Sequence, residues 1–323
     1  NTCFLNSCMQ ALSHTYELTA FLHSDKYKNH LKTLTDNIII NEWIDLYNVM
    51  WSQNGIVSPK RFVHNVQQLA IKKDRELFTG WAQNDLPEFL LFLVECMHNS
   101  IARGVKMNIK GTVKNNTDKL ATACYQMLKQ TYSNEYSEIM DMFYGIYVSE
   151  LSALNGKQVY SHRPESFFIL DLEIPGPNCS LYDCFTSFTK YETLDGENAW
   201  YNEEKGKKID VKKRITFWSL PKILIITLKR FSFDGKKKRQ DLVDIPLTDL
   251  TLSPFVSGYN KKQYIYDLYA VCNHSGNTQG GHYTAFVKTN TTWTHFNDTQ
   301  VQRNIPEDKI ITPKSYCLFY RKK

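Results

Sequence analysis

Hydrophobic positions near the start of the chain recur with the spacing of an α-helix. Residues three and four positions apart share one face of a helix, so this spacing marks a face that packs on a core. The pattern predicts a helix that begins at about residue 3. Its buried face consists of Phe4, Leu5, Cys8, Met9 and Leu12.

A second helix is predicted from about residue 85, where the sequence carries signals for a first turn. Asp85 can accept a hydrogen bond from a free N–H group at the helix start, and Pro87 is tolerated in the first turn. Glu88 occupies the position from which a capping box reaches back to the backbone. The apolar face of this helix consists of Phe89, Leu90, Phe92, Leu93, Cys96 and Met97.

From about residue 143 the pattern becomes that of β-strands. Short runs of β-branched and aromatic residues alternate with loops rich in Gly, Asn and Lys. Helices followed by strands predict an α+β fold rather than an alternating parallel one. The predicted strands cover residues 167–172, 215–218, 223–228, 264–271, 283–287, 293–296 and 316–320.

Length and composition are those of a globular protein. The chain has 323 residues, 42% hydrophobic and 22% charged, which suits one large domain or two ordinary ones. It has no run of about 18 apolar residues, so a membrane span is not expected. The first residues lack the features of a signal peptide and also an initiator Met, so we expect the natural start to lie upstream.

The net charge of +6 is small, and two local clusters of basic residues lie at 205–214 and 236–239. Such clusters occur in nucleic-acid-binding and nuclear-targeting segments. No aromatic residues are interleaved with them for stacking on bases, so solvated loops are the simpler interpretation. We therefore do not expect nucleic acid as a partner.

Eight cysteines are scattered along the chain, and no two of them form a C-x-x-C pair. In a chain of this length, that distribution favours reduced thiols in an intracellular protein of the cytoplasm or nucleus. Most are expected to be small buried hydrophobic residues. Cys3 differs because it begins a predicted helix, where free N–H groups and the helix dipole favour a thiolate nucleophile. The alternative is a cysteine that falls there by chance.

His282 is the candidate base for such a nucleophile. It follows two glycines, which leave room for an extended substrate, and it precedes a predicted strand. Its nearest rivals among the nine histidines are His274 and His295. A third group must orient the imidazole. A strand, turn and strand would bring Asn297 and Asp298 back beside His282.

Six motifs in this order resemble the catalytic domain of the ubiquitin-specific protease family, a group of papain-like cysteine peptidases. The resemblance covers essentially the whole chain. The motifs are NTCFLNS at residues 1–7 with Gln10, QNDLPEFL at 83–90, LP at 220–221 with LKRF at 228–231, GGHYTAF at 280–286, Trp293 with FND at 296–298 and Val301, and Tyr316 with LFYR at 318–321.

The resemblance implies a fold of three parts within one domain at residues 1–323. A helical thumb would cover about residues 1–140, fingers and palm about 141–225, and the rest of the palm about 226–323. It implies hydrolysis of isopeptide or peptide bonds after the C-terminal Gly of ubiquitin, with no cofactor. Ubiquitin and ubiquitinated proteins would be the partners of a monomeric enzyme.

The resemblance also assigns roles to individual residues. It implies that Cys3 is the nucleophile, His282 the general base and Asn297 the orienting residue, with Asp298 as a neighbouring acid that shares this role. Residues implied to contact the ubiquitin tail are Asp85, Glu88, Gly281 and Tyr283. The loops at 233–241 and 273–280 match two loops that overhang the cleft.

Two departures from the family pattern bear on function. The usual oxyanion donor, an Asn five residues before the nucleophile, would precede residue 1, and losing such a donor costs about 10²–10³ in rate. Many members also bind zinc through two C-x-x-C pairs, which align here with Leu154, Lys157, Asn202 and Lys205. No metal is therefore expected. Two alternatives stay open, a ubiquitin-binding pseudo-enzyme and a protease for a ubiquitin-like modifier.

Overall fold

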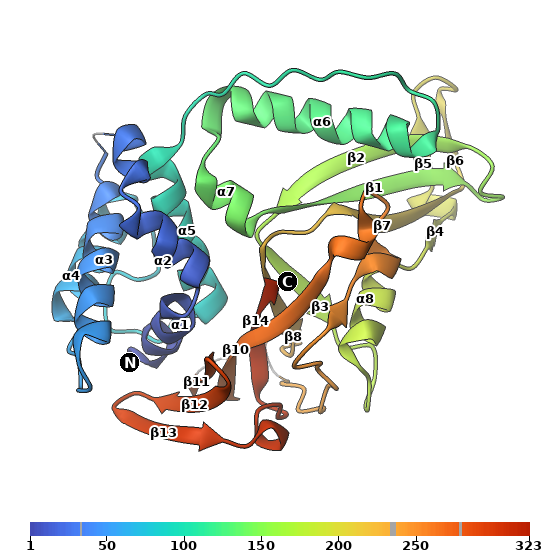
Figure 1. Ribbon diagram of the computed structural model, residues 1–323. Helices are drawn as coiled ribbons and strands as arrows, with labels where there is room; N and C mark the ends of the chain where they lie inside the picture. Colours follow the sequence, from blue (N-terminus) through green and yellow to red (C-terminus); the bar gives the residue numbers. More distant parts are fainter. Residues whose placement is uncertain (33, 233–236, 278–279) are drawn as a thin grey trace.

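The computed structural model describes residues 1–32, 34–232, 237–277 and 280–323. Helices dominate the first part of the chain and strands the second, which confirms the α+β prediction (Figure 1). The α-helices are α1 (Cys3–Ser13), α2 (Tyr16–His23), α3 (Asn37–Ser52), α4 (Lys60–Lys72), α5 (Leu86–Ile101), α6 (Asn116–Glu135), α7 (Glu138–Phe143) and α8 (Leu181–Thr189). Short 3-10 helices are η1 (Lys26–His30), η2 (Gly196–Asn198), η3 (Ser253–Phe255), η4 (Lys261–Gln263) and η5 (Glu307–Lys309).

The strands form two main sheets. The larger has eight strands in the order β13-β12-β11-β10-β14-β8-β3, with β9 paired to β10, and the smaller has four in the order β2-β1-β7-β4. Strands β5 and β6 pair with each other. The strands are β1 (Gly145–Ala153), β2 (Val159–Phe167), β3 (Ile169–Glu173), β4 (Glu192–Leu194), β5 (Trp200–Asn202), β6 (Lys207–Ile209), β7 (Val211–Ser219), β8 (Ile223–Lys229), β9 (Leu250–Thr251), β10 (Ile265–Gly276), β11 (Gly281–Thr289), β12 (Thr292–Asn297), β13 (Gln300–Ile305) and β14 (Ser315–Lys322).

The predicted strands all fall on observed ones, and one of them is divided. The run at 167–172 contains the end of β2 and most of β3, because Phe168 between them lies in neither strand. The hydrophobic runs were visible in the sequence because strands of the large sheet are buried on both faces. In β8, for example, Ile223, Leu224 and Ile225 are all fully buried.

Helix α1 lies between the helical part of the chain and the large sheet. It packs against α5 on one side and against β10, β11 and β12 on the other. The predicted apolar face is confirmed, because all five of its members are at most 6% exposed. The same core also includes residues of β10, β11 and β14. The first residue of α1 is thereby fixed against the strands that carry the candidate base.

The first turn of α5 forms largely as predicted. The Asp85 side chain accepts a hydrogen bond from the Glu88 backbone N–H at 3.3 Å, and Pro87 lies in the first turn. Among the described contacts, the reciprocal bond from the Glu88 side chain to the Asp85 backbone does not occur, so only half of the expected capping box is present.

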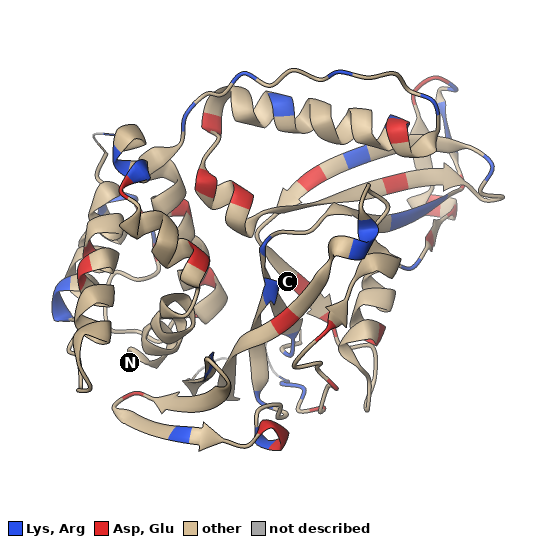
Figure 2. Ribbon diagram, in the orientation of Figure 1, with Lys and Arg blue, Asp and Glu red and all other residues tan. Residues whose placement is uncertain are grey.

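The basic cluster at 205–214 lies on the β5–β6 turn, β6 and β7. Lys213 pairs with Glu192 at 3.0 Å, and Arg214 pairs with Glu150 at 2.9 Å. Figure 2 shows acidic segments on strands beside this part of β7. The cluster is thus partly neutralised within its own sheet. Residue 236 of the second basic cluster lies outside the described residues.

At the far end of the small sheet lie the positions where the sequence resemblance places the zinc-binding pairs of other proteins. The Asn202 side chain is buried and accepts a hydrogen bond from the Lys205 backbone N–H at 2.9 Å. Nearby, the rings of Tyr160 and Trp200 stack with centroids 5.6 Å apart. Within the described residues, no group of three or more His, Cys, Asp or Glu side chains is arranged to hold a metal ion. No described helix is long and apolar enough to cross a membrane.

Candidate active site

Cys3 is the first residue of α1 and is 7% exposed. The preceding residue, Thr2, is the N-cap, and its side chain makes no capping hydrogen bond. The first backbone bond of the helix runs from the Asn6 N–H to the Thr2 carbonyl at 2.8 Å. The N–H groups before Asn6 therefore have no partner within the helix, and they give the helix start, where Cys3 lies, a positive partial charge.

His282 is the second residue of β11, and its ring is held by Asn297 at the end of β12. The His282 Nε2 atom lies 2.6 Å from the Asn297 Oδ1 atom. A carbonyl oxygen only accepts, so Nε2 carries the hydrogen and Nδ1 is left free to accept a proton. Among the described residues, no hydrogen bond joins Cys3 to His282. In apo enzymes such catalytic bonds are often long and tighten in the substrate complex.

Asp298 has a different contact from its neighbour Asn297. It lies in the turn after β12 with φ 50°, and its Oδ1 atom accepts a hydrogen bond from the Asn6 side chain at 2.7 Å. Asn6 is one turn beyond Cys3 in α1. The carboxylate thus ties the β12–β13 turn to the helix of the candidate nucleophile, while Asn297 makes the contact to the imidazole.

Asp85 is held by two tyrosine hydroxyls from the large sheet. Its Oδ2 atom accepts from Tyr316 at 2.9 Å and from Tyr283 at 3.2 Å. Burial raises the pKa of Asp85, and these hydrogen bonds oppose the shift. Tyr316 was present in the sequence motifs but was not assigned to the site. The contact joins α5 to β14 and β11, so only the tertiary structure reveals it.

Glu88 lies on the exposed side of the first turn of α5. Partial burial raises the pKa of Glu88, and the nearby charge of Asp85 adds a smaller effect in the same direction. The two carboxyl groups therefore differ in their surroundings. Asp85 is anchored inside the protein, and Glu88 is available to a ligand.

Gln83 is a second contact that the sequence analysis quoted in a motif without assigning it a role. Its Nε2 donates to the Gly281 carbonyl at 2.7 Å, and its Oε1 accepts from the Gly281 N–H at 2.7 Å. Gly281 also lies against His274 and Ser275, so that a side chain at this position has no space. The amide thereby fixes the peptide group that precedes His282.

The two rival histidines have structural surroundings. His274 is 4% exposed, and its Nδ1 atom lies 2.9 Å from the Lys238 ammonium. Burial lowers the pKa of His274 to about 4, and the positive charge of Lys238 contributes to this shift as the smaller cause. The His295 ring packs at a tilt against Phe286 with ring centroids 4.6 Å apart, and burial lowers the pKa of His295. Among the described histidines, only His282 hydrogen-bonds to Asn297.

The loops expected to overhang this site are described only in part, because residues 233–236 and 278–279 lie outside the described residues. The described ends of the loops are in contact. The Lys238 ammonium donates to the His274 carbonyl at 2.6 Å, and Phe231 pairs with Lys238 as an isolated bridge. Lys238 therefore links the ends of the two loops.

A comparison with known protein families agrees with the motifs found in the sequence. The model of the ubiquitin carboxyl-terminal hydrolase family matches residues 1–320. The chain belongs to this family. It is 32% identical over 336 residues to ubiquitin carboxyl-terminal hydrolase Usp2 of Drosophila melanogaster, covering 100% of the chain and 34% of that relative. It is 35% identical over 334 residues to ubiquitin carboxyl-terminal hydrolase 2 of Homo sapiens, covering 99% of the chain and 53% of that relative.

This family member also shares its fold with a solved structure. That structure is the SAGA Ubp8/Sgf11/Sus1/Sgf73 DUB module bound to ubiquitin aldehyde. The match has a TM-score of 0.74 at 23% identity, and it covers 100% of this chain and 68% of that one. The α+β arrangement of this chain is therefore shared with a chain of that module. The chain spans about a third to a half of the length of the two curated relatives described above.

Proposed function

We propose that this chain is a thiol-dependent deubiquitinase that hydrolyses the isopeptide or peptide bond after the C-terminal Gly of ubiquitin. The observation that carries the proposal is the contact between His282 and Asn297, on strands packed against the helix that begins at Cys3. Membership of the ubiquitin carboxyl-terminal hydrolase family supports the substrate.

The reaction is acyl transfer through a thioester. His282 Nδ1 takes the Cys3 proton, and the thiolate attacks the carbonyl carbon of the terminal Gly. N–H groups at the start of α1 stabilise the oxyanion that forms. The C–N bond breaks as His282 returns its proton to the leaving lysine amine. His282 then takes a proton from water, and the resulting attack releases the ubiquitin carboxylate and regenerates the thiol.

Recognition of the ubiquitin tail is assigned to residues beside this centre. The tail is extended and basic, and carboxylates form strong charge-assisted hydrogen bonds with basic side chains. Glu88 is exposed to such a ligand, and Asp85 is positioned by Tyr283. Gly281 lets the tail approach the backbone next to His282.

The remaining assignments follow from the same proposal. Residues of about 1–140 form the thumb, about 141–225 the fingers and palm, and about 226–323 the rest of the palm. All eight cysteines are free thiols, which supports an intracellular enzyme of the cytoplasm or nucleus. We propose that it acts as a monomer on ubiquitinated proteins.

The deciding experiment is hydrolysis of ubiquitin that carries a C-terminal fluorogenic amide. Release by the chain, with loss of at least about 10³-fold in Cys3→Ala, is expected because the nucleophile is removed. Cys124→Ala is the control, since Cys124 lies in the separate core beneath α6. A version preceded by a segment with Asn five positions before Cys3 tests the oxyanion contribution.

The outcomes separate the two alternatives. Binding of ubiquitin without release in any version would refute the protease and favour the pseudo-enzyme. Release of the fluorophore from a ubiquitin-like modifier, but not from ubiquitin, would show that the modifier is the substrate. Equal activity of Cys3→Ala and the parent chain would refute the assigned nucleophile.

A further inference from the structure

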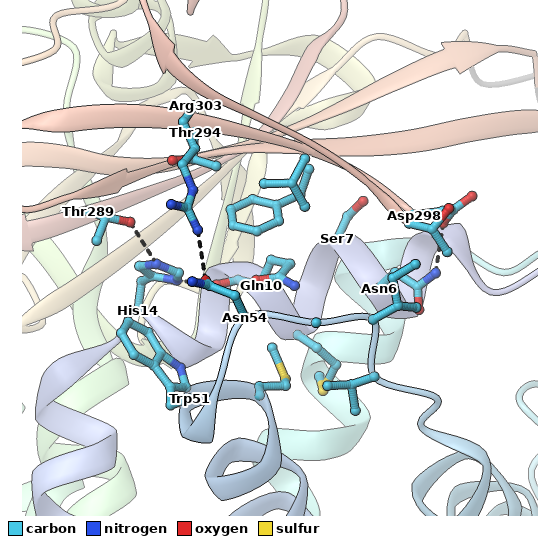
Figure 3. Close-up of a pocket in the computed structure, with 18 of the residues that line it drawn as sticks. Asn6, Ser7, Gln10, His14, Trp51, Asn54, Thr289, Thr294, Asp298 and Arg303 are labelled. Atoms are coloured by element: carbon cyan, nitrogen blue, oxygen red, sulfur yellow. Dashed lines mark hydrogen bonds between the residues drawn. The ribbon is translucent and has the colours of Figure 1, made fainter.

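A groove with a volume of about 1080 Å³ runs beside α1, between the helical part of the chain and the β12–β13 hairpin (Figure 3). One wall is the loop at residues 53–59 with the end of α3, and the opposite wall is formed by β12 and β13. Residues of α1 form its floor. Exposed apolar side chains on the two walls include Trp51 and Val301.

The groove begins next to the catalytic centre. Thr2 and Asn6, which flank Cys3 along α1, line it together with Asp298, the neighbour of Asn297. In Figure 3 the bonded pair Asn6 and Asp298 lies at one end, and His14 and Trp51 lie toward the other. A group that leaves Cys3 on this side therefore enters the groove directly.

The sheet places this groove opposite the side assigned to the ubiquitin tail. His282 lies on β11, with β10 and β14 on one side and β12 and β13 on the other. Tyr283 and Tyr316, which hold Asp85, belong to β11 and β14. The residues described as lining the groove do not include Gln83, Asp85, Gly281, Tyr283 or Tyr316. The groove thus extends from the leaving-group side of the scissile bond.

Its dimensions suit an extended peptide. The floor runs along α1 from Thr2 to His14, about 18 Å at 1.5 Å per helical residue. An extended chain covers that length with about five residues. Strand β13 is the edge of the large sheet, and Gln300, Val301 and Gln302 on it are exposed. Its outer backbone groups can pair with an extended ligand.

Charge indicates what such a peptide carries. Arg303 is the one Lys or Arg among the residues described as lining the groove, and it donates to the neutral Asn54 side chain at 2.8 Å. In Figure 3 this bond spans the groove between its walls. Among the described residues, Arg303 forms no salt bridge. A carboxylate of the bound peptide that took the place of the Asn54 side chain as the partner of Arg303 would form a stronger, charge-assisted hydrogen bond.

We propose that this groove binds the polypeptide that carries the ubiquitinated lysine, in extended form, with an acidic side chain against Arg303. The inference rests on the proposed function and names the part of the substrate on the other side of the scissile bond. Arg303 follows Asp298 by five residues of chain, at most about 18 Å. The acidic residue would therefore lie within about five residues of the acceptor lysine.

Two isopeptide conjugates test this. Each joins ubiquitin to the lysine of a short peptide, with Glu three residues from that lysine in one and Gln in the other. The parent chain should cleave the Glu conjugate with about two- to fivefold higher kcat/KM, as expected for an exposed ion pair. Arg303→Gln should bring the ratio to about 1, and Arg303→Glu should bring it below 1, in favour of the Gln conjugate. Arg163→Gln, an exposed change on β2, is the control and should keep the parent ratio.

Hydrolysis of the fluorogenic amide normalises each variant for folding and chemistry, because its leaving group does not extend to Arg303. Equal cleavage of the conjugates by the parent, or a ratio that Arg303→Glu does not change, would overturn the groove assignment and leave the deubiquitinase intact. Failure of the parent to cleave both the conjugates and the amide would instead overturn the proposed function, and this inference with it.

Discussion

Replacing Gly281 by Ala should damage both stability and activity, because the position has no space for a methyl group. A Cβ atom built there lies 2.5 Å from the Ser275 carbonyl oxygen and 2.9 Å from the Cε1 atom of His274, and it overlaps the Nε2 atom of the same ring. The carbonyl belongs to the paired strand β10 and cannot rotate away. The ring is held by Lys238 and packs at a tilt against the Tyr283 ring, with centroids 4.6 Å apart.

The size of the effect follows from these contacts. Overpacking a rigid site costs about 1–3 kcal/mol, which corresponds to a fall in Tm of roughly 1–5 °C for a domain of this size. The strand can relieve the clash only by shifting, and the next residue is His282. A displacement of about 1 Å at a reacting group costs about 10²-fold in rate. We therefore expect kcat/KM for the ubiquitin amide to fall by about that factor.

Gly280→Ala is the matched control. Among the described residues, a Cβ atom at Gly280 meets only the Gln83 Oε1 atom within 4 Å, at an ordinary distance of 3.7 Å. Its Tm and kcat/KM should stay within about 1 °C and twofold of the parent. Thermal unfolding followed by circular dichroism and the amide assay measure both quantities. Parent-like behaviour of Gly281→Ala, or equal losses in both variants, would refute the reasoning.

Two further predictions concern the histidines. Asn297→Ala should lower kcat by about 10²–10⁴-fold with little change in Tm, because the imidazole loses its orienting partner, whereas Asp298→Ala should lower kcat less. Kinetics of amide hydrolysis by the two variants check this, and a larger loss of kcat in Asp298→Ala would reverse the assignment. His274 has a pKa of about 4 in the folded protein, against an ordinary 6.5. Between pH 4 and 6.5 the unfolded chain therefore binds a proton at His274 that the folded protein does not, so stability should rise with pH across that range. Urea unfolding at pH 5 and 7 should show a smaller pH dependence in His274→Gln, by at most about 2 kcal/mol, and an unchanged dependence would contradict the depressed pKa.

Local patterns were sufficient to predict the elements that carry the site. The helix at Cys3 and the cap at Asp85 are encoded by neighbours within one turn, so their signals lie within a few residues. The strands were recognisable because burial on both faces leaves continuous apolar runs. The motif order then identified the family, which the match over residues 1–320 confirmed.

Contacts between distant segments could not be predicted in this way. The sequence left Asn297 and Asp298 as joint candidates, since neighbours in the chain are equally near His282 until the turn is built. The structure separates them, because Asp298 adopts φ 50° and bonds to Asn6 across 292 positions of sequence. The contact of Gln83 with Gly281 spans 198 positions and depends on how α5 docks against the sheet.

The contact of Gln83 with Gly281 has a thermodynamic consequence for any ligand that pairs with this backbone. Both the donor and the acceptor of Gly281 are already engaged by one side-chain amide, as they would be by a neighbouring strand. An incoming chain therefore exchanges hydrogen bonds at Gly281 instead of adding them. Its net gain there is the difference between two similar bonds, so affinity must come from contacts elsewhere on the ligand.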